Sequence, residues 1–219
     1  AHTAAVLDAV ESILGPDLLV WSCELFIKEP GTSKVVTWHQ DLTYWGLGET
    51  DEELTAWIAL SPSTRESGCM RFVPGSHHQA ILPHRDTFAD DNLLSRGQEI
   101  AVEVDETTAV DDVLAPGEMS LHHGRMFHAS GPNTSDDRRI GAVVRYITPS
   151  VRQIKAARDY AMPVRGRDTS GNWVHVPMPS APFDPSAIAL YEQVLADQSV
   201  ALAEGAQGAV GLYGKPAPA

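Results

Sequence analysis

Two stretches of the sequence carry side chains that could hold a metal ion. The first, residues 38–42, places an imidazole at His39 and a carboxylate at Asp41. If this stretch is an extended strand, residues two apart point to the same face, so the two side chains lie side by side. The second, residues 126–133, offers His128 within an apolar, strand-like run. Two histidines and one carboxylate on one face of a metal form the facial triad of non-haem Fe(II) oxygenases.

A His-x-Asp pair by itself is weak evidence, because composition alone puts about one such pair in a chain like this. A second pair, His84 and Asp86, stands in a polar run without a strand-like pattern, and we interpret it as part of a surface loop. His39, in contrast, ends an apolar extended run that can hold both ligands rigidly. The competing interpretation of His39 is a core histidine hydrogen-bonded to Asp41, and a core position is equally open to His128.

A candidate anchor for a carboxylate lies close to the second histidine in the sequence. Ser130 follows His128 by two residues, so both side chains point to the same face of a strand. Arg139 stands at the start of the next expected strand. A guanidinium beside a hydroxyl is a good carboxylate anchor, and a metal with a separate anchor suits a bidentate keto acid. The alternative for Arg139 is a surface salt bridge with Asp136 or Asp137.

The composition limits the class of protein and its partners. The chain has 219 residues, of which 43% are hydrophobic, and this suits one globular domain with a full core. With a net charge of −13, we expect no nucleic-acid partner and no anionic membrane surface as partner. Cys23 and Cys69 are expected as small core residues in a reducing compartment, which favours a cytoplasmic location. Nothing in the sequence indicates the oligomeric state.

The expected strands indicate a mainly β fold. Short strands separated by Pro and Gly turns, with few helices between them, are typical of a β-sandwich or a jelly-roll barrel. Residues 44–48 are expected as a loop after the first histidine. The strands are expected at residues 18–28, 35–41, 55–60, 70–73, 99–104, 117–122, 125–129 and 140–147.

Helices are expected to flank these strands. Thr3 can cap a helix that ends at about residue 14. Residues 78–97 are polar and mixed, and are expected to form an excursion over the surface. Residues 205–219 are expected as a tail that contributes little to the core. A C-terminal amphipathic helix is expected over residues 185–202, with a buried stripe of Ile188, Tyr191, Val194 and Leu195.

Five features of the sequence recur in a known family, and they are residues 38–42, 55–60, 68–77, 128–133 and Arg139. Taken together, their order and spacing resemble the phytanoyl-CoA dioxygenase (PhyH-like) family. These are Fe(II)- and 2-oxoglutarate-dependent oxygenases built on a double-stranded β-helix. The resemblance covers about residues 18–149, and implies that residues 1–219 form a single jelly-roll, cupin-like domain with flanking helices. Family members usually carry a longer N-terminal region that helps cover the active site, so we expect this lid to be absent or trimmed here.

The resemblance also implies roles for individual residues. His39, Asp41 and His128 are implied as iron ligands, and therefore as the catalytic centre. Arg139 and Ser130 are implied as anchors of the distal carboxylate of 2-oxoglutarate. Two further residues match family positions that line the cosubstrate pocket, and these are Gln40 and Trp57.

The implied function is a dioxygenase that uses Fe(II), 2-oxoglutarate and O2 to hydroxylate an unactivated carbon of a small-molecule substrate, releasing succinate and CO2. Related halogenases have a small residue in place of Asp41, so hydroxylation is favoured. Two alternatives stay open, namely a cupin-like metal enzyme that does not use 2-oxoglutarate and a non-catalytic binding barrel. Four residues are candidates for the substrate pocket, although core or rim positions suit them equally: Trp38, Tyr44, Trp45 and Arg145.

Overall fold

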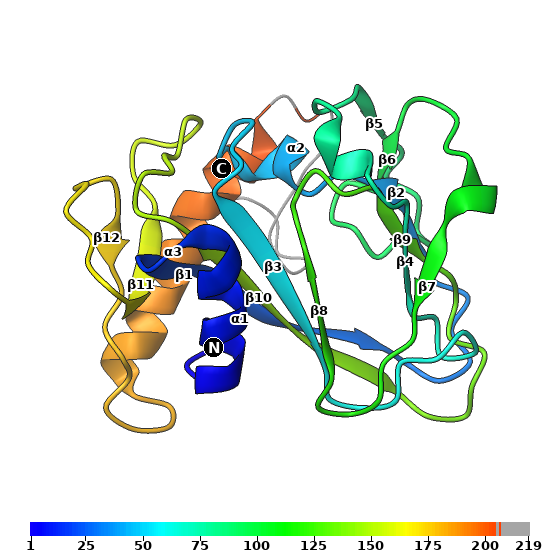
Figure 1. Cartoon of the computed structure of the whole chain (residues 1–219), viewed down its shortest axis with the longest axis horizontal. Coiled ribbons are helices and arrows are strands. Elements are labelled where there is room, and N and C mark those ends of the chain that lie inside the picture. Colours follow the sequence, from blue (N-terminus) through cyan, green and yellow to red (C-terminus); the bar gives the residue numbers. More distant parts are fainter. Residues whose placement is uncertain (205, 207–219) are drawn as a thin grey trace.

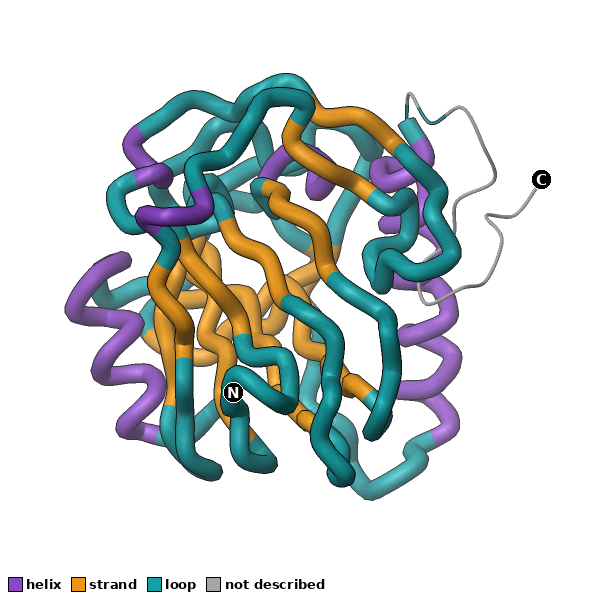
Figure 2. Tube along the Cα trace, turned by 90° about the vertical axis from the view of Figure 1, so that its right-hand side faces the viewer, coloured by secondary structure: helices purple, strands orange, loops and turns teal. Residues whose placement is uncertain are grey.

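Two β-sheets face each other in a computed structural model of the protein, which describes residues 1–204 and residue 206. The strands curve around a common interior and helices lie outside them (Figure 2). In Figure 1 the smaller sheet occupies the right of the molecule, whereas α1 (Ala4–Leu14) and α3 (Pro185–Ala203) lie at the left, outside the larger sheet. This arrangement confirms the expected mainly β, jelly-roll fold with flanking helices.

The larger sheet runs, within the described residues, in the order β12, β11, β1, β10, β3 and β8. Its central pairs are antiparallel, as in a jelly roll. Its strands are β1 (Leu18–Lys28), β3 (Glu53–Ala59), β8 (Met119–His122), β10 (Arg139–Ile147), β11 (Tyr160–Arg165) and β12 (Val174–His175).

The smaller sheet runs in the order β2, β9, β4 and β7 across the described residues. A separate antiparallel pair joins β5 (His84–Asp86) to β6 (Gln98–Ile100). The smaller sheet consists of β2 (Val36–His39), β4 (Met70–Phe72), β7 (Val110–Asp112) and β9 (His128–Ser130). Short helical segments are α2 (Leu42–Trp45), η1 (Ser76–His78) and η2 (Glu106–Thr108).

The two faces of β10 have different surroundings, because successive side chains of a strand point to opposite faces. On the outer face, Val144 and Tyr146 pack against Val6 and Val10 of α1 in a buried apolar cluster. The inner face carries side chains that line a cavity, among them Arg139. The larger sheet therefore uses one face for the core under α1 and the other for the interior of the barrel.

Four strands were not expected from the sequence. β5 and β7 are short and charged, and Pro163 lies within β11, so none of them shows a run of alternating apolar residues. Backbone pairing with a neighbouring strand defines them instead, as for β11 against the start of β1. The strand expected at residues 99–104 is limited to β6, and β12 pairs only with β11.

Three local expectations are wrong. The segment expected as a loop at residues 44–48 begins with the last turn of α2. Thr3 occupies the N-cap of α1, but its side chain makes no capping hydrogen bond. Cys23 is exposed on the outer face of β1, whereas Cys69 is buried as expected. The tail expected over residues 205–219 lies, except for residue 206, outside the described residues.

The buried stripe expected for α3 is also wrong. Ile188 is 44% exposed and Tyr191 is 54% exposed, and only Ser199 and Ala201 are buried in this helix. Polar contacts attach α3 to the barrel, such as the hydrogen bond from the Tyr160 hydroxyl to Asp197 at 2.6 Å. An amphipathic pattern alone did not show which face of the helix is covered. No described helix has the length and apolar character needed to cross a bilayer.

Gly141 allows Trp57 to lie flat against β10. A Cβ atom at this position would lie 2.2 Å from Cζ2 of the Trp57 ring, which is much closer than atoms can approach. We therefore expect Gly141→Ala to destabilise the fold by about 1–3 kcal/mol, because the indole must move. Chemical denaturation of the variant measures this change in the free energy of unfolding.

Gly131→Ala is the matched control, since a Cβ there has no neighbouring atom within 4 Å. We expect this control to unfold at nearly the wild-type denaturant concentration. Equal stability of the two alanine variants would show that Trp57 is not held against Gly141.

Candidate metal centre

The three proposed ligands come together at one end of the smaller sheet. His39, Asp41 and His128 each offer a ligand atom, and these atoms all lie within 4.8 Å of one another. His39 ends β2 and His128 begins β9, and the antiparallel register places them opposite each other. Their ring centroids are 4.0 Å apart. Among the described residues, clustered His, Cys, Asp and Glu side chains that could hold a metal ion form this group and no other.

Asp41 reaches this group through a turn rather than through a strand. β2 ends at His39, and Asp41 has helical backbone angles (φ −59°, ψ −45°) immediately before α2. Its Oδ1 nevertheless lies 3.3 Å from Nε2 of His39. The expected proximity of the pair is therefore correct, but the strand periodicity that predicted it does not produce it.

The backbone orients both imidazole rings. Nδ1 of His39 lies 2.9 Å from the carbonyl oxygen of Thr37, and Nδ1 of His128 lies 3.0 Å from that of Met126. A carbonyl oxygen only accepts, so Nδ1 carries the proton in each neutral ring and Nε2 keeps its lone pair. Metal-binding histidines are usually oriented by such a hydrogen bond, and this donor set therefore suits a divalent metal.

The protonation states also suit a metal. Burial, followed by the charge of His39, holds the pKa of His128 well below its usual value, so the ring is neutral at pH 7. Burial alone would raise the pKa of Asp41, but its contact with His39 and the neighbouring His128 hold it well below the usual value. A neutral imidazole and an ionised carboxylate are the forms that bind metal ions.

A cavity joins this group to the candidate carboxylate anchor. Arg139 lines the same cavity as the three metal-ligand candidates, and so do Ser130 and Trp57. Leu94, from the segment expected to pass over the surface, also reaches this wall. The remaining side chains of the wall come from both sheets. They are five apolar residues and three polar or charged ones: Phe26, Val36, Met70, Ala129 and Val143, with Thr55, His122 and Arg145.

Arg139 is a buried cation, not a surface residue. Its side chain is 1% exposed, and Nη1 donates to the carbonyl oxygen of Gly68 at 2.5 Å. The rings of Phe26 and Trp57 flank the guanidinium at 5.7 and 5.2 Å. Burial lowers its pKa to about 10, and its Nε has no hydrogen-bond partner among the described residues. Among the described residues, Arg139 forms no salt bridge with Asp136 or Asp137, which was the alternative considered from the sequence. A buried guanidinium of this kind suits an anion.

Gln40 does not line the cavity. Its side-chain amide donates to the carbonyl oxygen of Arg125 at 3.0 Å, and its Oε1 accepts from the N–H of Leu82 at 2.8 Å. The backbone N–H of Gln40 donates to Nε2 of His84 at 3.0 Å. Gln40 therefore connects the metal-ligand segment to the chain behind it, in place of the expected contact with a cosubstrate.

The second His-x-Asp pair is not part of a surface loop. His84 is half-buried in β5, where its Nε2 supports Gln40, and Asp86 pairs with the buried Arg96. Neither residue belongs to the group of candidate ligands. His84 and Asp86 are thus not candidate ligands, as expected. The expected surface loop is wrong, because these residues form a strand.

Several buried groups near the centre were not found from the sequence. His122 lines the cavity, and burial lowers its pKa to about 4. Glu53 accepts from the N–H of Gly124 at 2.7 Å and from the Thr55 hydroxyl at 3.0 Å. Burial, together with the charge of Asp41, raises the pKa of Glu53 to about 8, so it is mostly protonated at pH 7. No metal-binding or carboxylate-binding motif in the sequence marks either residue.

A second cavity of about 410 Å³ adjoins the centre beside His39 and Asp41. Of the candidates for a substrate pocket, Tyr44, Trp45 and Arg145 line it. The guanidinium of Arg145 lies 4.7 Å from the Trp45 ring centre and pairs with Glu24 at 2.5 Å. Part of the cavity wall is therefore aromatic, and it carries this ion pair.

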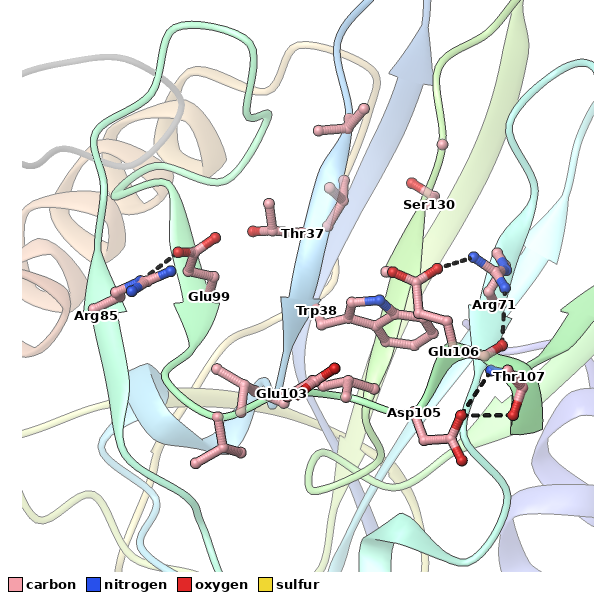
Figure 3. A pocket seen from close by; sticks show the side chains of 17 residues that line it. Thr37, Trp38, Arg71, Arg85, Glu99, Glu103, Asp105, Glu106, Thr107 and Ser130 are labelled. Carbon is pink, nitrogen blue, oxygen red and sulfur yellow. Dashed lines mark hydrogen bonds and ion pairs between the residues drawn. The ribbon is translucent and has the colours of Figure 1, made fainter.

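Trp38 lies elsewhere, in a groove on the outer side of the smaller sheet. Figure 3 shows its indole beside Arg71, whose guanidinium lies 5.6 Å from the ring centre. Arg71 also pairs with Glu106 at 2.8 Å. Trp38 precedes His39 in β2, and adjacent side chains of a strand point to opposite faces. It is therefore a groove residue and does not line the cavity beside the candidate ligands.

Comparison with known proteins gives a consistent picture. Residues 1–141 match the family described as "Phytanoyl-CoA dioxygenase (PhyH)". The chain is 27% identical to the "Probable alpha-ketoglutarate-dependent hypophosphite dioxygenase" of Stutzerimonas stutzeri, over 75% of this chain and 58% of that protein. It is 32% identical to "Phytanoyl-CoA dioxygenase domain-containing protein 1" of Danio rerio, over 51% of this chain and 39% of that protein. The chain thus spans about half the length of the curated relatives it matches.

Solved structures share the fold. The apo form of the non-heme monooxygenase ThoJ superposes with a TM-score of 0.82 at 40% identity, over 92% of this chain and 73% of that chain. The epimerase SnoN in complex with Fe3+, alpha ketoglutarate and nogalamycin RO superposes with a TM-score of 0.54 at 28% identity, over 68% of this chain and 57% of that chain. These similarities agree with the jelly-roll arrangement and with a metal centre inside it.

Proposed function

The chain belongs to the phytanoyl-CoA dioxygenase (PhyH) family, and we propose that it is an Fe(II)- and 2-oxoglutarate-dependent dioxygenase that hydroxylates an unactivated carbon of a small molecule. One observation carries this proposal. A His39–Asp41–His128 group and a buried arginine without an acidic partner among the described residues line the same cavity. The first suits iron and the second suits the distal carboxylate of a keto acid.

Each residue has a distinct task in this proposal. His39, Asp41 and His128 would hold the iron through two imidazoles and one carboxylate. Arg139 and Ser130 would hold the distal carboxylate of 2-oxoglutarate, and Trp57 forms part of the apolar wall of the cavity. Bound iron, 2-oxoglutarate and O2 supply the oxidising chemistry, with succinate and CO2 as products.

Hydroxylation is the outcome that the site and its relatives favour. Asp41 supplies a carboxylate to the group of candidate ligands. It therefore occupies the place that a halide would need in a halogenase. The ThoJ protein, at 40% identity, is described as a monooxygenase, whereas SnoN is described as an epimerase. The adjoining cavity lined by Tyr44, Trp45 and Arg145 is our candidate site for the small-molecule substrate.

Two other functions fit the site less well. A cupin-like metal enzyme without 2-oxoglutarate has no need of a buried guanidinium in its cavity, and burial of such a charge without a partner is costly. A non-catalytic binding barrel has no need of two imidazoles, each oriented by a backbone carbonyl, beside one carboxylate. Both alternatives predict no chelation of 2-oxoglutarate by iron.

Ligand-dependent stability tests the proposal directly. Mn(II) followed by 2-oxoglutarate is expected to raise the melting temperature, because each ligand binds only the folded state. A ligand at a hundredfold its dissociation constant contributes about 2.7 kcal/mol. Anaerobic Fe(II) with 2-oxoglutarate should in addition give a weak visible charge-transfer band. Thermal scans and absorption spectra measure these effects.

Mg(II) and the His128→Ala variant are the controls, since an acidic chain binds divalent ions nonspecifically. Succinate, which lacks the keto group, should stabilise less than 2-oxoglutarate. A melting shift with 2-oxoglutarate that persists without metal and in His128→Ala would contradict the proposed cosubstrate site.

A further inference from the structure

A buried lysine lies behind the candidate carboxylate anchor. Lys28 ends β1, is 1% exposed, and stands directly opposite Arg139 in the pairing of β1 with β10. Its Nζ donates to the carbonyl oxygen of Ser130 at 3.2 Å and to that of Gly131. Two buried basic residues therefore stand opposite each other on neighbouring strands, and one of them, Arg139, lines the cavity.

No acidic side chain among the described residues forms an ion pair with either cation. The charged and titratable groups that act on Lys28 are Arg139 and the thiol of Cys69. Like charges opposite each other in a sheet are destabilising, and a buried charge without a partner is costly. Such an arrangement indicates a site that is completed by an anion.

Lys28 also holds the backbone that carries Ser130. A Cβ atom on Gly68 would lie 2.6 Å from the carbonyl oxygens of Gly131 and Pro132, so the residues that follow β9 pack directly on Gly68. The carbonyl oxygen of Gly68 in turn accepts from Arg139 at 2.5 Å. The end of β9 thus lies between Lys28 on one side and the segment bound by Arg139 on the other.

We propose that Lys28 is a positioning residue for the distal carboxylate of 2-oxoglutarate, an inference that rests on the proposed function. Its ammonium group binds the carbonyl oxygens of Ser130 and Gly131, which fixes the Ser130 side chain at the cavity wall. It also adds a second positive charge beside Arg139. Lys28 is not itself part of the cavity lining, so it acts through Ser130 and through its charge.

The acid–base behaviour of Lys28 agrees with this role. Burial, followed by the charge of Arg139, lowers its pKa to about 7. An anion bound nearby favours the charged ammonium and raises this pKa, so binding takes up a proton. The contribution of Lys28 to affinity is therefore complete below pH 7 and is lost as the pH rises through the higher pKa of the bound state.

The experiment compares two keto acids on the Mn(II)-loaded protein by isothermal titration calorimetry. 2-Oxoglutarate has the distal carboxylate, whereas 2-oxopentanoate chelates metal in the same way without it. We expect Lys28→Met to weaken the binding of 2-oxoglutarate by about tenfold or more and to leave the affinity for 2-oxopentanoate unchanged. Lys28→Arg should recover most of the affinity, because the charge is kept. Lys34→Met, at an exposed lysine of the next segment, should change neither.

Each outcome decides one question. If the wild-type protein does not bind 2-oxoglutarate with Mn(II), the proposed function fails. The proposed role of Lys28 is wrong if wild type and Lys28→Met bind 2-oxoglutarate equally well. It is also wrong if Lys28→Met loses affinity for both keto acids to the same extent. Should Lys28→Met not fold, the pH profile replaces it: wild type should lose 2-oxoglutarate affinity between pH 7 and 9, and Lys28→Arg should keep it. Identical pH profiles would overturn the inference.

Discussion

Replacing His39, Asp41 or His128 with alanine is expected to abolish iron-dependent turnover. Each substitution removes one of the three ligand atoms that lie within 4.8 Å of one another. Losing a residue that merely orients a metal ligand costs roughly 10- to 100-fold, so losing a ligand should cost more. Release of succinate from 2-oxoglutarate measures turnover, and Mn(II) titration measures the affinity of the site.

The other His-x-Asp pair offers the matched control. His84→Ala should keep metal binding, with a partial loss of turnover because the N–H of Gln40 loses its acceptor. Circular dichroism confirms that each variant is folded. Full activity of Asp41→Ala in halide-free buffer would show that the carboxylate is not a ligand, and loss of metal in His84→Ala alone would move the centre to β5.

Replacing Arg139 with alanine is expected to weaken 2-oxoglutarate binding by about 30- to 1000-fold. The lost charge-assisted contact is worth about 2–4 kcal/mol, and Arg139 is only 1% exposed, so bulk solvent does not screen this contact. Iron affinity should change little, because Arg139 is not among the candidate ligands. Arg139→Lys should recover only part of the affinity, since a point charge replaces a planar fork.

Arg138→Ala is the control for Arg139. This neighbouring arginine is exposed and pairs with Glu29 at 2.8 Å, and surface pairs of this kind contribute little. Its apparent requirement for 2-oxoglutarate should match that of wild type. A change of iron affinity without a change of 2-oxoglutarate dependence in Arg139→Ala would place the anchor elsewhere.

Local spacing in the sequence, together with the family resemblance, was sufficient to nominate the candidate ligands and the candidate carboxylate anchor. His128 and Ser130 share a face because both lie in β9, and a two-residue period is a short-range property of any strand. The apolar runs of β1, β3 and β10 likewise predicted their strands. The same reasoning placed Asp41 beside His39 for the wrong reason, because a turn and not a strand brings them together.

Only the tertiary structure decided which distant residues meet. The register of β2 with β9 brings His39 opposite His128, and the register of β1 with β10 brings Lys28 opposite Arg139. Burial of these charges follows from the packing of both sheets, which no single segment encodes. For the same reason the sequence missed Lys28, which reads as an ordinary polar residue at the end of an apolar strand.

The direction of individual side chains was also decided by packing. Gln40 points to the chain near Leu82, and the first half of α3 leaves Ile188 and Tyr191 exposed. Residue type states what a side chain can do, and local periodicity states which neighbours share its face. The element that covers that face depends on contacts between segments far apart in the chain, and these contacts form only in the folded barrel.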